Sequence, residues 1–284
     1  MFKVKLNKNE VKILITIQKG PMTISQLASG LKKNPSWISR NVDHLEELGF
    51  VNGKRVGKTV LVKIDDGPMG ACISTLISEE SMLNIEAVLS GSGLRILPLI
   101  LEPGNNAKEI ARRSSLSLRT VQGLLSRWRK MGVVALTNGC YMISERHQPL
   151  IEFVKLYSYN TIIRSLGRSF YDASIVWHWR DEFMFSTEQP MRDSKFISAA
   201  TTRLRELDYD VISVKDYYFY NPLQKIVSEE EALMQSLRVD PENPRLSRLV
   251  KNAIVNKNID ANTLLNYAGK YGIKTKIEEL VESA

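Results

Sequence analysis

The segment that most constrains the fold of this chain is residues 34–49, which carry the start, the apolar face and the stop of one helix. Asn34 can cap the helix with its side-chain oxygen, Pro35 suits the first helical position, and Gly49 supplies a left-handed residue after its end. Helical spacing predicts one buried face, made of Ile38, Val42, Leu45 and Leu48.

The flanking sequence completes a helix-turn-helix followed by a β-hairpin. Upstream, Thr23 can cap a short helix over residues 24–31, and a turn at residues 32–34 separates the two helices. Downstream, residues 50–51 and 59–64 are strand-like runs joined by a polar loop that carries basic residues. This order of elements predicts a winged helix-turn-helix that contacts DNA, and the alternative is the same fold in a purely structural role.

A resemblance to a known family rests on three short motifs. These are ISQLA at residues 24–28, WISRNV at residues 37–42 and LEELGFV at residues 45–51. With them, residues 7–64 resemble the winged-helix domain of MarR-type and related archaeal regulators. These motifs are specific for the fold but say almost nothing about the DNA sequence that is bound. The resemblance implies double-stranded DNA as the partner.

Candidate DNA-contacting residues lie on the polar face of the second helix and on the wing. Arg40 suits a bidentate contact with guanine or a phosphate, although a solvated arginine is the alternative. Trp37 suits either a groove or the domain's own core. Asp43 and Glu46 would repel phosphate, so only the N-terminal half of the helix is expected to approach DNA. The candidates are Ser36, Trp37, Ser39 and Arg40, with Lys54, Arg55 and Lys58 on the wing.

A second helix-turn-helix is predicted downstream, in residues 94–144. Residues 24–51 align without a gap on residues 107–134, and the caps and glycine stops coincide. Asn138 and Gly139 favour a tight hairpin, but this second wing has no Lys or Arg at its tip. DNA contact and a packing or dimerisation role therefore both stay open. The candidate contacts are Arg112, Arg113, Arg119, Thr120, Gln122 and Arg127.

The remaining sequence has a different pattern of apolar and aromatic residues, which predicts an α+β domain. A long helix over residues 150–166 precedes two strands within residues 174–187, a helix over 194–207 and a strand-like run over 211–220. Everything from residue 228 is expected to be helical. The fold class expected for the whole chain is mainly α with a small amount of β. The expected domains are residues 1–67, residues 68–147 with linker helices and the second winged helix, and residues 148–284.

Two segments near the C-terminus carry a weaker resemblance. Residues 222–237, PLQKIVSEEEALMQSL, are similar to the segment that precedes the terminal helices of AbiE-type antitoxin regulators, and so are residues 259–268, IDANTLLNYA. This resemblance implies an autoregulatory, antitoxin-like role with a protein partner for the C-terminal domain. Residues 196–209 depart from that family, because they lack its small-residue and glycine pattern.

Composition narrows the class of protein. Lys plus Arg number 39 against 31 Asp plus Glu, which gives a net charge of +8 and favours an anionic partner. Cys72 and Cys140 lie far apart, so free thiols and a cytoplasmic location are expected. A signal peptide is not visible, and no apolar run reaches the roughly 18 residues of a membrane-spanning helix.

Catalytic machinery is not expected. His44, His147 and His178 are scattered, and the chain lacks the spacing of a zinc site or a phosphate-binding loop. We therefore predict no enzyme activity, no metal and no cofactor. The alternatives are a protein–protein scaffold built from winged helices and, more weakly, a nucleotidyltransferase-like enzyme. A homodimer is expected from an aromatic surface in the C-terminal domain, formed by Trp177, Trp179, Tyr217, Tyr218 and Tyr220.

Overall fold

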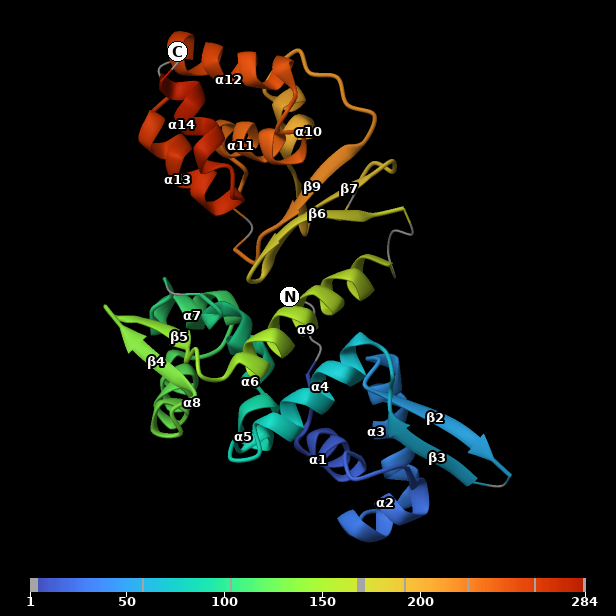
Figure 1. Ribbon diagram of the computed structural model, residues 1–284. Coiled ribbons are helices and arrows are strands. Elements are labelled where there is room, and N and C mark those ends of the chain that lie inside the picture. The colour runs from blue at the N-terminus through green and yellow to red at the C-terminus, as the bar shows by residue number, and fades with distance from the viewer. Residues whose placement is uncertain are drawn as a thin grey trace. The chain divides into compact units, whose positions relative to one another are not determined.

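A computed structural model describes residues 5–57, 59–102, 104–167, 172–191, 193–223, 225–257 and 259–282 (Figure 1). The chain divides into two compact units, Met1–Thr161 and Ile162–Ala284. The division falls inside one helix, α9 (Gln148–Gly167). The domain boundaries expected at residues 67 and 147 both lie within the first unit and stay predictions.

The first half of unit 1 is a winged helix-turn-helix. Asn7 and Thr23 each form a capping box at the start of a helix, and Lys32 adopts a left-handed conformation (φ 52°) in the turn between the second and third helices. The three strands form an antiparallel sheet of order β1-β3-β2. The elements are α1 (Lys8–Ile17), β1 (Met22–Thr23), α2 (Ile24–Leu31), α3 (Pro35–Glu47), β2 (Val51–Val56) and β3 (Thr59–Ile64).

The second half of unit 1 ends in a similar run of elements, two helices followed by a two-stranded hairpin. Ser115 repeats the left-handed turn residue (φ 52°), and Gly132 (φ 71°) follows its helix as Gly49 (φ 75°) follows α3. Ser115 lies 83 residues after Lys32, and Gly132 lies 83 residues after Gly49. Both pairs therefore keep the register of the ungapped sequence alignment. The elements are α4 (Pro68–Glu79), α5 (Ile85–Leu89), α6 (Gly93–Ile96), η1 (Leu97–Ile100), α7 (Ala107–Ser114), α8 (Leu118–Lys130), β4 (Val134–Thr137) and β5 (Cys140–Ile143).

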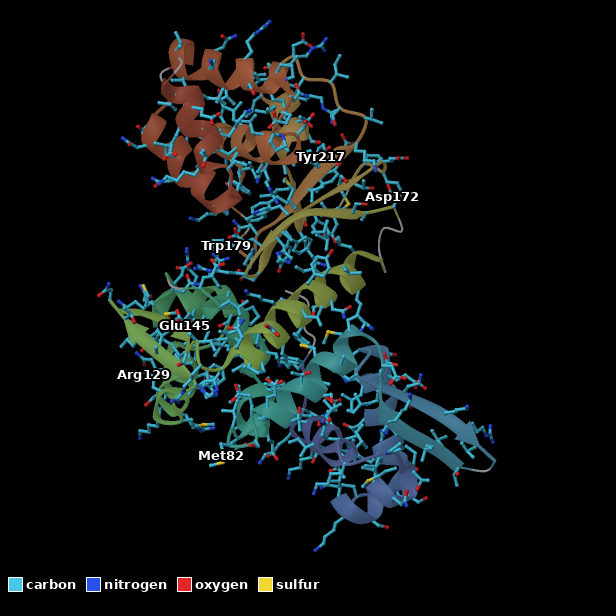
Figure 2. The ribbon with its side chains drawn as sticks, viewed as in Figure 1. Met82, Arg129, Glu145, Asp172, Trp179 and Tyr217 are labelled. Carbon is cyan, nitrogen blue, oxygen red and sulfur yellow. The ribbon has the colours of Figure 1, made fainter. Side chains whose placement is uncertain are left out.

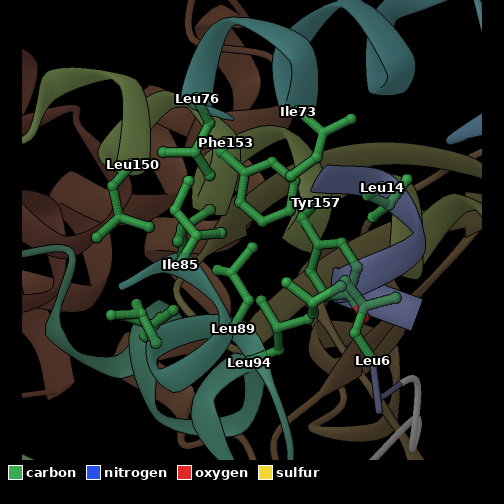
Figure 3. Close-up of a cluster of buried hydrophobic side chains, with 14 of the residues drawn as sticks. Leu6, Leu14, Ile73, Leu76, Ile85, Leu89, Leu94, Leu150, Phe153 and Tyr157 are labelled. Carbon is green, nitrogen blue, oxygen red and sulfur yellow. The ribbon is translucent and has the colours of Figure 1, made fainter. Parts of the chain in front are cut away.

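One hydrophobic core runs through both halves of unit 1 (Figure 3). The N-terminal part of α9 contributes Phe153 and Tyr157, whose rings stack with centroids 5.8 Å apart. Phe50, which follows α3, stacks on Phe153 at 6.1 Å. Because Val121, Leu125 and Trp128 of α8 belong to the same core, the two halves of unit 1 are packed as one body.

Unit 2 is an antiparallel sheet of order β6-β7-β9-β8 with helices gathered on one face (Figure 1). Trp177, Met184 and Phe219 point from the sheet into the core that these helices share. The strands are β6 (Ser174–Trp179), β7 (Glu182–Thr187), β8 (Phe196–Ser198) and β9 (Asp216–Tyr220). The helices are α10 (Ala200–Glu206), α11 (Glu229–Val239), α12 (Pro244–Lys257), α13 (Ala261–Tyr271) and α14 (Lys274–Glu282).

Two expectations for unit 2 are wrong in detail. The helix expected over residues 194–207 begins only at Ala200, because Phe196 pairs with Tyr220 as part of β8. The strand expected over residues 211–220 begins only at Asp216. Ile212 and Val214 lie in the loop before this strand and not in the sheet, so their side chains are 87% and 93% exposed.

The aromatic side chains that suggested an exposed interface pack mostly within unit 2. Trp177 lies in the helix-covered core, with its ring centroid 4.6 Å from that of Tyr271. On the other face of the sheet, Tyr220 stacks on Phe183 and Tyr218 lies tilted against Phe185, with ring centroids 5.9 Å apart. Trp179 and Tyr217, labelled in Figure 2, are half-buried. The homodimer stays a prediction, but this surface no longer supports it.

Candidate nucleic-acid interface

Helix α3 is held against the core by an apolar stripe and presents its opposite face to solvent. Ile38, Val42 and Leu45 are buried, as the helical spacing predicts. The Asn34 side chain accepts a hydrogen bond from the Ser36 amide at 2.9 Å, which caps the helix where a DNA-reading helix would enter a groove.

A partly buried polar network fixes the orientation of α3 against α1. The Asn7 side-chain amide donates to Asn41 Oδ1 at 2.9 Å, and the Asn41 amide donates to the Trp37 carbonyl at 2.7 Å. His44 Nδ1 lies 2.8 Å from Glu10 Oε1. This network was not predicted from the sequence, although a polar Asn41 beside the apolar stripe is a signal that could have found it.

The wing is tied to α3 at its base and projects from the core at its tip. The Gly53 amide donates to Glu46 Oε1 at 3.2 Å, so this carboxylate has a structural role beside any effect on phosphate. Lys54 and Arg55 are exposed, but they lie on strand β2 and not in the loop, because the ladder pairs them with Leu61 and Val60. Lys58 lies outside the described residues.

The face of α3 that is open to solvent contains the predicted contacts. Ser36 and Arg40 are exposed, and among the described residues the Arg40 side chain has no hydrogen bond or ion pair. Ser39 is partly buried. Trp37 packs partly against the core, and the Lys33 ammonium lies 5.8 Å from the centre of its ring. Trp37 is therefore shared between the core and the surface.

The candidates on α7 and α8 are divided by their surroundings. Arg119, Thr120, Gln122 and Arg127 are exposed on α8. Arg129, labelled in Figure 2, is exposed at the C-terminal end of the same helix. Arg112 pairs with Glu109 at 2.7 Å. Arg113 is only 7% exposed, because it points from α7 toward the protein interior. Arg113 is therefore not part of the candidate surface.

Residues 7–53 match the family described as bacterial regulatory protein, arsR family. This segment is an ArsR-family helix-turn-helix domain. The family is a winged-helix regulator family related to MarR, so the sequence resemblance is right about the type of domain. No curated protein shows significant similarity to the chain. An ArsR-family domain implies DNA-binding transcriptional regulation, whereas neither the second copy nor the AbiE-type resemblance is supported by a match.

Neither a metal site nor a membrane span is found in the described parts of the chain. In the residues that the structure describes, no group of three His, Cys, Asp or Glu side chains could hold a metal ion. The helices within the described ranges include none with the length and hydropathy needed to cross a bilayer.

Unit 2 contains a buried cluster of ionisable groups. The Lys270 ammonium lies 2.9 Å from Glu182 Oε2 and 2.8 Å from Glu231 Oε1. The Tyr271 hydroxyl donates to Glu231 at 2.7 Å and accepts from the Gln235 amide at 2.8 Å. Burial alone would lower the pKa of Lys270, but the two carboxylates raise it by more, so the net pKa lies above its ordinary value.

Hydrogen bonds join Tyr271 and Lys270 to Glu231, whereas among the described residues Glu182 Oε2 has its ion pair with Lys270 but no hydrogen bond. Burial and the Glu231 carboxylate raise the pKa of Tyr271 far above its ordinary value, so the hydroxyl stays protonated as a donor. The Lys270 ammonium also lies 5.1 Å from the centre of the Phe219 ring. The arrangement cross-links β7, α11 and α13, and we interpret it as a structural lock.

Proposed function

We propose that this protein is a sequence-specific double-stranded DNA-binding transcriptional regulator that reads DNA through α3 and the wing of its ArsR-family domain. The observation that carries the proposal is an exposed, unpaired Arg40 on α3 beside a wing that presents Lys54 and Arg55, all within the described residues. In a winged helix, a helix in the major groove reads base edges and basic residues on neighbouring elements bind phosphates.

Within this proposal the residues have different tasks. Ser36, Ser39 and Arg40 lie on the N-terminal half of α3 and would contact base edges, with Arg40 suited to guanine. Lys54 and Arg55 would bind phosphates and set the register on the duplex. Trp37 would contribute only its exposed edge.

The second helix-turn-helix is proposed as an accessory contact. Its wing tip, Thr137–Cys140, has no basic residue, so it offers no phosphate clamp like that of the first wing. Gln122 remains available as an exposed polar side chain on α8, whereas Arg112 on α7 is already paired with Glu109. Because both halves share a core, its contribution is best tested by substitutions in the full chain and not by separate fragments.

Replacing Arg40 or Lys54 with Ala should weaken duplex binding without unfolding the protein. Loss of a bidentate base contact by Arg40 should cost about 1–3 kcal/mol and relax sequence preference. Loss of one phosphate contact by Lys54 should weaken binding to all sequences and reduce the slope of log K against log salt by about one. Fluorescence anisotropy with duplexes selected from genomic fragments, at several salt concentrations, measures both effects.

Lys155→Ala is a matched control, since Lys155 is an exposed lysine on α9 and its loss changes the net charge by the same amount. It should leave both affinity and salt slope unchanged. If Arg40→Ala and Lys54→Ala bind every duplex as tightly as the parent at every salt concentration, the first helix-turn-helix is not the reader.

We further propose that unit 2 supplies association with a second copy of this chain. Two readers on two half-sites would raise affinity and specificity over one reader. Light scattering of the full chain at micromolar concentration should give twice the monomer mass. A monomeric mass together with tight binding to the selected duplex would contradict the homodimer.

A further inference from the structure

A groove in unit 1 lies between α8 and the segment from Asn84 to Ser92, which contains α5 and leads to α6. It has a volume of about 520 Å³. One wall is formed by Arg119, Gly123 and Arg127, and the facing wall by Glu86, Ser90 and Ser92. Lys8, the first residue of α1, closes one side. We call this site the α8 groove.

The three residues from α8 form a notch flanked by two positive charges. Arg119, Gly123 and Arg127 are spaced by four residues, so they follow one line along the helix, with the two arginine α carbons roughly 12 Å apart. Glycine is unfavourable in a helix interior, and no turn or packing contact requires one here, since a Cβ at Gly123 would meet nothing within 4 Å. The bare backbone leaves room between two side chains that are long enough to bend toward it.

The charges on the groove are unbalanced. Within the described residues, neither the Arg119 nor the Arg127 side chain has a hydrogen bond or ion pair. The one carboxylate on the wall, Glu86, already lies 2.9 Å from the Lys8 ammonium and 3.7 Å from that of Lys12. The two guanidinium groups are therefore left to attract an anion from solvent.

We propose that the α8 groove binds the phosphate group of a small anionic ligand, held over Gly123 by Arg119 and Arg127. A guanidinium presents two parallel donors that match the oxygens of a phosphate. Ser90 and Ser92 on the facing wall carry hydroxyl groups that hydrogen-bond the rest of a polar ligand.

The shape of the groove favours a free ligand over a duplex. Its volume falls in the range of small-molecule sites. A DNA-reading helix must insert its exposed face into a major groove about 12 Å wide, whereas the line from Arg119 to Arg127 faces a protein wall. The same phosphate chemistry could be supplied by a DNA backbone that passes the mouth of the groove, and measurements with and without DNA separate the two sources.

The groove is connected to the proposed reading helix. Ser90 pairs with Leu6 in a parallel bridge, and the Gly91 amide donates to the Leu6 carbonyl at 3.0 Å. The next residue, Asn7, hydrogen-bonds Asn41 of α3 at 2.9 Å. A ligand that shifts this segment would change the position of α3, so we expect phosphate to alter DNA affinity; this consequence rests on the proposed function.

Titration of the full chain with inorganic phosphate, at ionic strength held constant with chloride, tests the site. Isothermal calorimetry should show saturable binding that weakens about tenfold in Arg119→Ala and in Arg127→Ala, since each loses hydrogen bonds between charged groups. Gly123→Leu fills the notch while leaving both arginines in place, and it should abolish binding. Circular dichroism confirms that each variant keeps its helices.

Matched controls lie on the same helix outside the groove. Arg129→Ala removes an exposed arginine, and Ser126→Leu adds a leucine at an exposed position, so both should bind phosphate as the parent does. A parent that shows no saturable binding, or groove variants that bind as the parent does, would overturn the small-ligand site. Because this titration contains no DNA, its outcome is independent of the proposed function.

A second arm identifies the source of the phosphate. If phosphate binds and shifts duplex affinity in the parent but not in Gly123→Leu, the free ligand is a regulator. If phosphate binds without any such shift, the regulatory link is wrong. If inorganic phosphate does not bind but Arg119→Ala and Arg127→Ala lower duplex affinity and flatten its salt dependence, the DNA backbone supplies the phosphate. If neither effect appears, the phosphate site does not exist.

Discussion

Replacing Lys270 with Met should destabilise unit 2 by about 3–5 kcal/mol, because two buried carboxylates would lose the counter-charge that they share. The Glu182 and Glu231 side chains are 5% and 10% exposed, so water cannot replace the ammonium group. Met has a similar length and keeps the packing of the lysine stem, which isolates the loss of charge. Urea denaturation of the full chain, followed by hydrogen exchange of peptides from α11 and α13, measures the effect on this unit.

Two further variants make the interpretation specific. Lys274→Met removes an exposed lysine whose partner Glu278 is 3.7 Å away, and it should change stability by less than about 0.5 kcal/mol. Adding Glu182→Gln and Glu231→Gln to Lys270→Met should recover part of the loss, since the charges that the lysine neutralised are then removed. Equal stability of Lys270→Met and the parent would mean that the cluster is solvated and does not lock the unit.

Replacing Trp128 with Ala should cost unit 1 about 3–5 kcal/mol, and more than Leu45→Ala at the equivalent position of the first helix-turn-helix. Trp128 is fully buried and lies against Gly93, where an added β carbon would be 3.6 Å from its ring. Its indole nitrogen also reaches the Ala87 carbonyl at 3.5 Å, so the residue joins α8 to α5. The cavity left by truncation would open in the core that both halves share.

Thermal and urea unfolding of the full chain, followed by circular dichroism, measures this loss. Arg129→Ala is the control, because it alters the next residue of α8 at an exposed position and should stay within about 0.5 kcal/mol of the parent. A Trp128→Ala melt that overlays the parent would mean that the indole is not buried in solution.

Local signals in the sequence account for most of unit 1. Caps at Thr23 and Asn34 and the glycine stop at Gly49 predict the boundaries of α2 and α3 to within about two residues, because capping depends on the side chain and its nearest amides. The same reasoning located α7 and α8 by their register with α2 and α3. Where the prediction fails, in residues 194–198, a strand exists only because its partner β9 lies beside it.

The candidate DNA interface was predicted less completely than the fold. Helical spacing correctly placed Arg40 on the exposed face of α3, opposite Ile38 and Val42. The same spacing could not show that Arg113 is buried, because that depends on which neighbouring element covers α7. Nor could it show that the Glu46 carboxylate accepts a hydrogen bond from Gly53 of the wing, since this contact depends on how the chain folds back after α3.

The sequence alone determined the net charge of +8 and the elements whose stability comes from neighbouring residues. These elements are the capped helices and the hairpin at Asn138 and Gly139. Only the tertiary structure decided which charges face solvent and which are enclosed. Lys270 and Arg119 are both basic residues on helices, yet one is enclosed by two carboxylates and the other faces an open groove. Burial and pairing arise from segments distant in the chain, so no local pattern can encode them.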